Sequence, residues 1–457
     1  MVWNWLGHNG VARWRASRAS FNGARVRRTL ADCAKGVGGE ASARRRVAEL
    51  AALYRALSDE SRRAFLALLA QAGIGDDPDP ALFDAFRQVS GVERRLAAIR
   101  LRAALAGASL RVLKQFNLLD DGVKFLVDLR ADAMRLGPGE RALAVVDEEL
   151  LGLFGDWFAL GNLELRRISW QSPAALLEKL MSYEAVHEIR SWTDLRHRLD
   201  SDRRCYAFFH PRMADEPLVF VEVALTRRVA SSIQSLLDES TPAADPRSAT
   251  AAVFYSISST QAGLRGVAFG GFLIKRVVEK LLGEFPRLGT FATLSPVPGF
   301  RRWLERQLDD AANSLLCDRD RIALERLTGN AGAAAAMRAA IAGDFTADRP
   351  LGATLEACLT PLCARYLALA KRDGAPIDPV ARFHFGNGAR LARIDWLADG
   401  SARGMRQSLG MMVNYEYEPS RIEANHEAYF RDGKVAVSRS IRRLLRNGET
   451  TSKEDLP

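Results

Sequence analysis

The sequence predicts two domains, an α-helical bundle over residues 1–157 and an α/β domain over residues 158–457. In the first part, apolar residues recur at helical spacing, as at Leu50, Leu53 and Leu57, and strand patterns are missing. In the second part, strand-like and helix-like stretches alternate, which is typical of a layered α/β domain. A chain of 457 residues is long enough to give each domain its own core.

The first domain is predicted to consist of several helices. Ser58 is followed by Asp59 and Glu60, which is a typical start of a helix. Turn-forming residues cluster at 73–80 and 137–139 and separate the helical stretches. No group of polar residues suited to catalysis occurs here. We therefore interpret this domain as structural, with a role in assembly.

Composition narrows the possible partners. The net charge of +10 suits anionic partners, but the basic residues are spread along the chain and no nucleic-acid-binding signature accompanies them. A small anionic ligand, or solubility alone, is favoured over nucleic acid. No stretch approaches the roughly twenty apolar residues that cross a bilayer, so no membrane partner is predicted. The five cysteines and six histidines form neither C-x-x-C nor H-E-x-x-H, so no metal site is predicted.

The stretch from Ala251 to Phe300 carries the clearest functional signal. A buried strand is predicted at 253–257, four glycines follow between residues 263 and 271, and an amphipathic helix begins near Leu273. The free amide groups at a helix start attract phosphate. The glycine spacing matches neither the dinucleotide nor the P-loop fingerprint. On spacing alone, a pyrophosphate cradle and a tight turn are equally favoured.

Two runs in the second domain resemble the malonyl-CoA decarboxylase family. One is SISSTQAGLRGVAFGGFLIKRVV with the following LSPVPGF, and the other is FHFGNGARLARIDWLADGSARGMRQSLGMMVNYEY, which spans Phe383 to Tyr417. The resemblance covers most of the chain after about Trp157. The first domain is similar only as a helical segment of suitable size.

The resemblance implies a fold, an activity and an assembly. The catalytic domain of the family is similar to the GNAT acetyltransferase fold, with coenzyme A beside a central strand. The reaction turns malonyl-CoA into acetyl-CoA and CO2 without an added cofactor. The helical domain makes oligomer contacts in the family, so a homo-oligomer, a tetramer by resemblance, is expected.

The resemblance also implies catalytic residues. Ser295 lies in a loop that two prolines and a glycine constrain, His384 lies between two phenylalanines, and Tyr417 ends the second run. Taken alone, such a serine is more often a turn residue and such a histidine a core residue. In the family the two form the active pair. His384 would supply a proton, Ser295 would engage the malonyl carboxylate and relay the proton, and Tyr417 would hold the histidine or the carboxylate.

The coenzyme is expected on the loop before the helix. Family members often have an acid where this chain has Ala268, so we expect the backbone amides of 265–271 to hold the ligand. The predicted substrate-binding residues are Arg265, Gly266, Val267, Ala268, Phe269, Gly270 and Gly271. The side chains of Arg265, Lys275 and Arg276 could also neutralise phosphates.

Two other functions stay open at this point. An acyl-CoA-dependent N-acetyltransferase would use the same phosphate loop. A non-enzymatic, CoA-responsive or assembly protein would use the helical domain. The first 50 residues contain ten basic and three acidic residues, which fits either the basic start of a bacterial cytoplasmic protein, which we prefer, or a mitochondrial transit peptide for the matrix.

Overall fold

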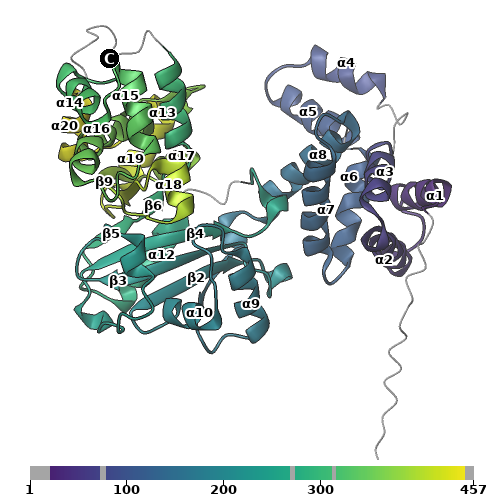
Figure 1. Ribbon diagram of the computed structural model, residues 1–457. Coiled ribbons are helices and arrows are strands. Elements are labelled where there is room, and N and C mark those ends of the chain that lie inside the picture. Colours follow the sequence, from purple (N-terminus) through teal and green to yellow (C-terminus); the bar gives the residue numbers. More distant parts are fainter. Residues whose placement is uncertain (1–20, 73–78, 106, 268–272, 311–314, 448–457) are drawn as a thin grey trace, which may run out of the picture. The chain divides into compact units, whose positions relative to one another are not determined.

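The computed structural model describes residues 21–72, 79–105, 107–267, 273–310 and 315–447 (Figure 1). The chain forms two compact units. The helical unit comprises the residues up to Ala159 together with Gln261–Val267. The sheet unit comprises Leu160–Thr260 and the residues from Ala268 onward. A helical N-terminal region followed by a mixed α/β domain is the fold class that the sequence predicts.

The helical unit contains helices and no strand in its described part. The predicted start at Ser58 is confirmed, because the Ser58 hydroxyl caps the third helix by accepting the backbone N–H of Ser61. The helices are α1 Gly23–Ala34, α2 Glu40–Ala56, α3 Asp59–Ala70, α4 Pro80–Gln88, α5 Gly91–Leu105, α6 Ala108–Gln115, α7 Gly122–Leu136 and α8 Arg141–Trp157.

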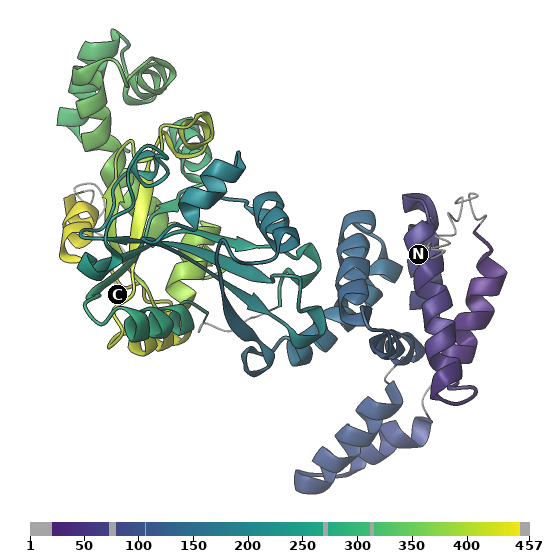
Figure 2. The same ribbon diagram turned by 90° about the horizontal axis from the view of Figure 1, so that it is seen from below.

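Aromatic residues form the centre of this unit. The ring of Tyr54 on α2 meets those of Phe65 on α3 and Phe125 on α7 edge to face, with ring centroids 5.0 and 5.8 Å apart. By contrast, α4 and α5 contain no buried residue, and Val92 and Ile99 of α5 are exposed. This pair of helices projects from the other helices of the unit in both views (Figures 1 and 2).

The segment Gln261–Val267 packs on α7. A Cβ atom on Gly263 would lie 1.8 Å from the carbonyl oxygen of Val127, so only glycine fits there. Arg130 of α7 is buried and donates to the carbonyl oxygens of Gly263 and Arg265, at 2.7 and 2.8 Å. On spacing alone, a tight turn and a pyrophosphate cradle are equally favoured for the glycine-rich stretch that begins at Gly263. At Gly263 itself, the missing side chain allows two backbone segments to approach.

The sheet unit is built on an eight-stranded sheet with the order β1-β2-β3-β4-β5-β10-β6, in which β9 also pairs with β10. All neighbouring strands are antiparallel except β4 and β5, which are parallel. The strands are β1 Glu164–Ile168, β2 Arg203–Phe209, β3 Val219–Thr226, β4 Ala251–Ser259, β5 Thr290–Thr293, β6 Ser295–Pro296, β9 Arg390–Asp395 and β10 Met412–Glu416.

Helices cover both faces of this sheet. On one face, Leu180 of α9 and Leu195 of α10 pack against Cys205 of β2. On the other face lies α12, whose predicted apolar side is buried from Leu273 to Leu281. The guanidinium of Arg276 on α12 lies over the ring of Phe208, which points away from α9 and α10. The bounds are α9 Ala174–Tyr183, α10 Trp192–Arg198, α11 Ile233–Leu236 and α12 Leu273–Glu284.

The helices that follow β6 in the sequence, α13 to α20, lie mostly at one end of the sheet unit (Figure 1). In Figure 2, green helices from this set extend beyond the sheet. A hairpin of β7 Lys371–Arg372 and β8 Ala375–Pro376 lies between two of them. They are α13 Phe300–Asp309, α14 Asp318–Thr328, α15 Ala333–Ala342, α16 Arg349–Ala368, α17 Pro379–Gly386, α18 Ala402–Ser408, α19 Ile422–Asp432 and α20 Arg439–Asn447. Within the part of the chain that the structure describes, none of the helices combines the length and apolarity needed to span a membrane.

The pairing of β4 with β5 ends at Thr293, just before Ser295. The parallel ladder runs from Ala251 opposite Thr290 to Phe254 opposite Thr293. Directly after it, β6 leaves β4 and pairs with β10, so that Ser295 lies opposite Val413. The strand change therefore places Ser295 two residues beyond the end of the ladder.

Candidate active site

Ser295 is fixed by the loop that follows it. Its side chain is buried, and the chain then passes through two prolines to Gly299, the first residue before α13. A Cβ atom on Gly299 would lie 2.3 Å from the hydroxyl oxygen of Tyr366 on α16. A side chain at position 299 would therefore displace the Tyr366 hydroxyl, and glycine lets the loop after Ser295 cross it closely.

His384 is fixed by the helix that carries it. Asp378 caps α17 by accepting the backbone N–H of Ala381 at 2.8 Å, and it also accepts the hydroxyl of Tyr366 at 3.1 Å. Pro379 stands at the first helical position, where its missing N–H has no cost. His384 lies in the last turn of α17 and is 2 % exposed.

The structure brings together the three catalytic residues expected from the sequence. Ser295 Oγ lies 3.1 Å from His384 Nε2, and His384 Nδ1 lies 2.7 Å from the hydroxyl of Tyr417. Tyr417 directly follows β10 and is buried. From the sequence alone, a half-buried tyrosine would have been equally expected at this position. The hydrogen bonds join three segments of the chain, of which the first two lie 89 residues apart. Each ring nitrogen of the histidine thus has one partner.

Burial controls the charge of this group. Loss of hydration lowers the pKa of His384 from 6.5 to about 3, because the imidazolium form is disfavoured in an apolar site. The same burial raises the pKa of the Tyr417 phenol well above its ordinary value. At neutral pH the imidazole is therefore uncharged, the phenol keeps its hydrogen, and the site carries no net charge of its own.

Two neighbours of this group were not identified from the sequence. The hydroxyl oxygens of Thr293, on β5, and Ser295 are 2.8 Å apart. The ring of Tyr415, on β10, stacks on the imidazole of His384, with ring centroids 4.4 Å apart. Residues two apart in an extended chain point to the same side, so the spacing of Thr293 from Ser295 could have revealed it. For Tyr415 the signal is its place two residues before Tyr417.

The predicted coenzyme loop is described only in part. Arg265 and Gly266 are exposed, Val267 is buried, and Gly266 has a φ of +83°, which favours glycine. Ala268, Phe269, Gly270 and Gly271 lie outside the described residues. The two basic side chains at the start of α12 have protein partners. Lys275 pairs with Glu423 at 2.5 Å. Arg276 donates to the carbonyl oxygen of Leu163 at 3.2 Å.

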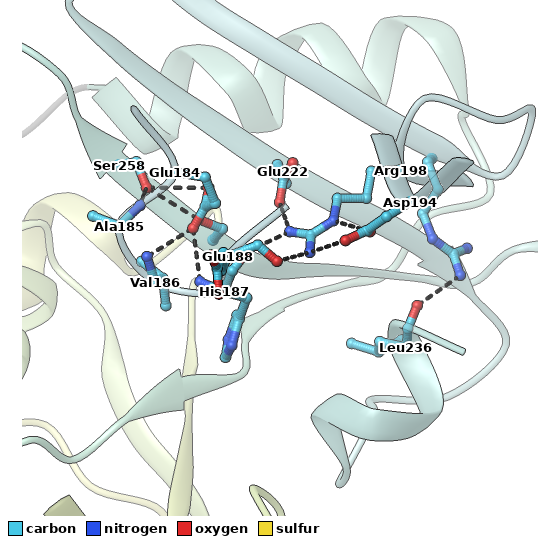
Figure 3. Close-up of polar contacts among 12 residues, drawn as sticks. Glu184, Ala185, Val186, His187, Glu188, Asp194, Arg198, Glu222, Leu236 and Ser258 are labelled. Carbon is cyan, nitrogen blue, oxygen red and sulfur yellow. Dashed lines mark hydrogen bonds and ion pairs between the residues drawn. The ribbon is translucent and has the colours of Figure 1, made fainter. Parts of the chain in front are cut away.

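A second polar group, which we call the Arg198 cluster, consists of Arg198 and Asp194 of α10, Glu222 of β3 and Glu184, which follows α9 (Figure 3). Arg198 is 1 % exposed and donates two hydrogen bonds to Asp194, at 2.7 and 3.2 Å. It also donates to Glu222 of β3 at 3.2 Å and to the carbonyl oxygens of His187 and Glu188. One guanidinium thus joins α10, β3 and the segment between α9 and α10.

The carboxylates of the Arg198 cluster differ in how they are satisfied. Glu184 accepts the hydroxyls of Ser256 and Ser258 and the backbone N–H groups of Val186 and His187. Glu222, in contrast, is fully buried and one of its oxygens has no hydrogen-bond partner among the described residues. Burial, followed by the nearby charge of Glu184, raises the pKa of Glu222 to about 8 against the opposing effect of Arg198.

The part of the chain that the structure describes contains no group of three or more His, Cys, Asp or Glu side chains that could hold a metal ion. The hydrogen-bonded residues around Ser295 carry hydroxyl, phenol and imidazole groups. These groups can donate hydrogen bonds and move protons between them.

Comparison with known proteins defines the class first. Residues 161–455 match a family described as the malonyl-CoA decarboxylase C-terminal domain, and residues 78–158 match the malonyl-CoA decarboxylase N-terminal domain. The protein is accordingly an enzyme of the carboxy-lyase class.

Relatives match over most of the chain. Mitochondrial malonyl-CoA decarboxylase of Mus musculus is 37 % identical over 432 residues, which are 89 % of this chain and 86 % of the mouse protein. The crystal structure of malonyl-CoA decarboxylase from Rhodopseudomonas palustris is 42 % identical, with a TM-score of 0.81 over 92 % of this chain and 99 % of that one. The structure from Agrobacterium vitis is 40 % identical over the same shares of both chains, with the same TM-score. The chain belongs to the malonyl-CoA decarboxylase family.

Proposed function

We propose that this enzyme converts malonyl-CoA and a proton into acetyl-CoA and CO2 by means of Ser295 and His384, without an added cofactor. The observation that carries the proposal is the 3.1 Å contact between Ser295 Oγ and His384 Nε2, inside a chain that belongs to this family. The contact is buried, so a proton held there is kept from bulk water.

The reaction sets two requirements. When the bond between the α-carbon and the carboxylate breaks, CO2 leaves and the electron pair stays on the α-carbon, from which it delocalises into the thioester oxygen. Hydrogen-bond donors aimed at that oxygen stabilise the enolate, and loss of one such donor typically raises the barrier by about 3 to 4 kcal/mol. A positioned group must then give a proton to the α-carbon.

The side chains of the site fit the second requirement. In our proposal the Ser295 hydroxyl first binds the malonyl carboxylate. After CO2 has left, this hydroxyl gives its hydrogen to the α-carbon and takes the Nε2 hydrogen of His384, while Nδ1 takes the hydrogen of the Tyr417 hydroxyl. Once acetyl-CoA has left, one proton from solvent neutralises the row, so that malonyl-CoA and one proton give acetyl-CoA and CO2. The Tyr417 hydroxyl, 2.7 Å from Nδ1, holds the ring in the required orientation.

We propose that the coenzyme phosphates bind the backbone amides of residues 265–271, ahead of α12, because the amide groups of a helix start attract anions. Ala268 supplies no carboxylate, so the scheme needs none from that position. The ion pair between Lys275 and Glu423 and the packing of Arg276 on Phe208 leave these cations a smaller part in phosphate binding than the sequence suggests.

Assembly and location extend the proposal. We propose that the protein is a homo-oligomer, a tetramer by resemblance, held through the helical unit. The exposed apolar side chains of α5, among them Val92 and Ile99, are consistent with such contacts. For location we keep the bacterial cytoplasm, with the mitochondrial matrix as the alternative.

The test compares S295A and H384N with a control, S408A. Ser408 is also a buried serine, but its hydroxyl donates to the carbonyl oxygens of Gly404 and Met411. CO2 release from malonyl-CoA without any amine should fall about 10²-fold to 10⁴-fold in the two site variants and stay near the wild-type rate in S408A. Coenzyme A affinity should change little in all three.

Three outcomes would change the proposal. Unaltered rates in S295A and H384N would remove both residues from the mechanism. A wild-type protein that releases no CO2 but acetylates an added amine would favour the acetyltransferase instead. A protein that binds coenzyme A and turns over neither substrate would favour the non-enzymatic alternative.

A further inference from the structure

Tyr417, His384 and Ser295 form a row of side chains linked by hydrogen bonds, and this row does not end at Ser295. Thr293 lies beyond it, fully buried at the end of the β4–β5 ladder. Its hydroxyl oxygen accepts two hydrogen bonds, one from Ser295 Oγ at 2.8 Å and one from the backbone N–H of Tyr415 at 3.1 Å. A hydroxyl oxygen has two lone pairs, and both are used.

Thr293 is itself held in place. Its carbonyl oxygen accepts the side-chain amide of Asn414 at 2.7 Å, and Asn414 directly precedes Tyr415 on β10. The ring of Tyr415 stacks on His384 at 4.4 Å. The same strand thus fixes the threonine hydroxyl from one side and the imidazole plane from the other, so the distances within the row are set by the sheet.

The donors and acceptors of the row determine where the imidazole hydrogen lies. The ring is uncharged and carries one hydrogen. Because the Ser295 hydroxyl donates to Thr293, it does not donate to Nε2, so the 3.1 Å contact is a hydrogen bond from Nε2–H to Ser295 Oγ. Nδ1 is then an acceptor, which suits the Tyr417 hydroxyl at 2.7 Å. All hydrogens in the row point from Tyr417 toward Thr293.

We propose that Thr293 is a positioning residue, which holds the Ser295 hydroxyl away from the imidazole so that His384 carries its hydrogen on Nε2 in the resting enzyme. The inference rests on the proposed function for its effect on turnover, but the position of the ring hydrogen does not depend on turnover. When the malonyl carboxylate arrives, the serine hydroxyl turns from Thr293 to the ligand. Nε2–H is then already directed at Ser295 Oγ and can replace the hydrogen that the serine gives up, while Nδ1 takes the hydrogen of the Tyr417 hydroxyl.

The experiment uses two variants. T293V removes the hydroxyl of Thr293 but keeps the shape of the side chain, and T293S keeps the hydroxyl. T290V is the matched control, since Thr290 begins the same strand outside the row. Enzyme labelled with ¹⁵N-histidine is examined by ¹H–¹⁵N correlation spectra, in which the two neutral tautomers give different patterns. The spectrum of H384Q identifies the His384 signals among those of the six histidines.

Wild type, T293S and T290V should show the Nε2–H tautomer. T293V should shift toward Nδ1–H, because the freed serine hydroxyl can donate to Nε2. In T293V kcat should fall on the order of 10-fold to 100-fold, with KM within about twofold of wild type, while T293S stays within about threefold in kcat. A T293V enzyme with wild-type tautomer and wild-type kcat would overturn the proposal.

A second variant covers the case in which T293V does not fold. In Y417F the phenol can no longer donate to Nδ1. If Thr293 sets the tautomer, the Nε2–H pattern persists in Y417F, and if Tyr417 sets it, the pattern changes and the proposal fails. Failure of the proposed function gives a different result, since S295A and H384N would then keep wild-type turnover whatever the tautomer.

Discussion

The row around Ser295 and the Arg198 cluster are both buried polar groups of the sheet unit, yet they are built on opposite principles. In the row, Thr293, Ser295, His384 and Tyr417 are all uncharged, and each bond joins two neutral groups. The Arg198 cluster instead places one cation among several carboxylates. The row can move a hydrogen without separating charge, whereas the cluster holds secondary-structure elements together through charge.

This difference indicates which group is suited to which task. Buried charges resist change, because removal of one partner leaves the other without compensation in a medium of low polarity. Neutral hydrogen bonds are worth less individually, typically about 1 kcal/mol net. We therefore expect substitutions in the Arg198 cluster to act mainly on stability and substitutions in the row to act mainly on turnover.

The largest effect on stability is expected for R198M. The variant keeps much of the side-chain volume, but it leaves the Asp194 carboxylate without its cation and Glu222 without its hydrogen-bond donor. It also removes both bonds to the segment at His187 and Glu188. The free energy of unfolding, measured with urea, should fall by about 3 to 5 kcal/mol.

The control for R198M is R196M on the same helix. Arg196 is exposed, and its guanidinium lies 5.8 Å from the ring centre of Trp170, a contact worth about 0.5 to 1 kcal/mol at an exposed site. S295A should likewise cost only about 1 kcal/mol of stability. An R198M protein no less stable than R196M would contradict the comparison.

A different effect, which appears only when stability is measured as a function of pH, is expected for E222Q. The pKa of Glu222 is raised from 4.5 to about 8, so in this window the folded protein keeps a proton that the unfolded chain has released. Wild type should therefore lose stability relative to E222Q as pH rises from 4.5 to 8, by at most about 1.4 kcal/mol per pH unit. Urea titrations of both proteins across this range measure the difference. A constant difference would show that Glu222 does not titrate there.

The smallest measurable effect is expected for H384Q, with the opposite sign. The pKa of His384 is lowered from 6.5 to about 3, so between these values the unfolded chain binds a proton that the folded protein does not. Wild type should lose stability relative to H384Q as pH falls below 6.5. Only the upper part of this window is accessible before general acid unfolding, which limits the effect. Parallel stability curves for the two proteins between pH 4.5 and 7 would speak against a neutral, buried imidazole.

Much of the fold could be predicted because it depends on local patterns. Helical spacing identified the first unit, and Ser58 marked the start of α3. The apolar periodicity of α12 correctly gave its buried face. The packing of Gln261–Val267 on α7 could not be predicted in this way. It depends on Gly263 meeting Val127 and on buried Arg130, and these contacts join segments more than 130 residues apart.

The candidate site likewise combines features that the sequence could predict with contacts that it could not. Ser295, His384 and Tyr417 were selected by resemblance, and their residue types alone favoured a turn and a core histidine. That they meet follows from the sheet order, in which β10 lies between β5 and β6. The Arg198 cluster gave no signal at all, because an arginine between two basic stretches looks like solvent-exposed charge in a sequence.

Tyr366 on α16 connects the helices after β6 to the candidate active site. Its hydroxyl bonds to Asp378, the cap of the helix that carries His384, and it occupies the space next to Gly299, in the loop that follows Ser295. The phenol of Tyr366 thus contacts both the segment that carries Ser295 and the segment that carries His384, which are distant along the chain. Any redesign of α13–α16 that displaces this ring would misalign the serine and the histidine together, although neither residue had been altered.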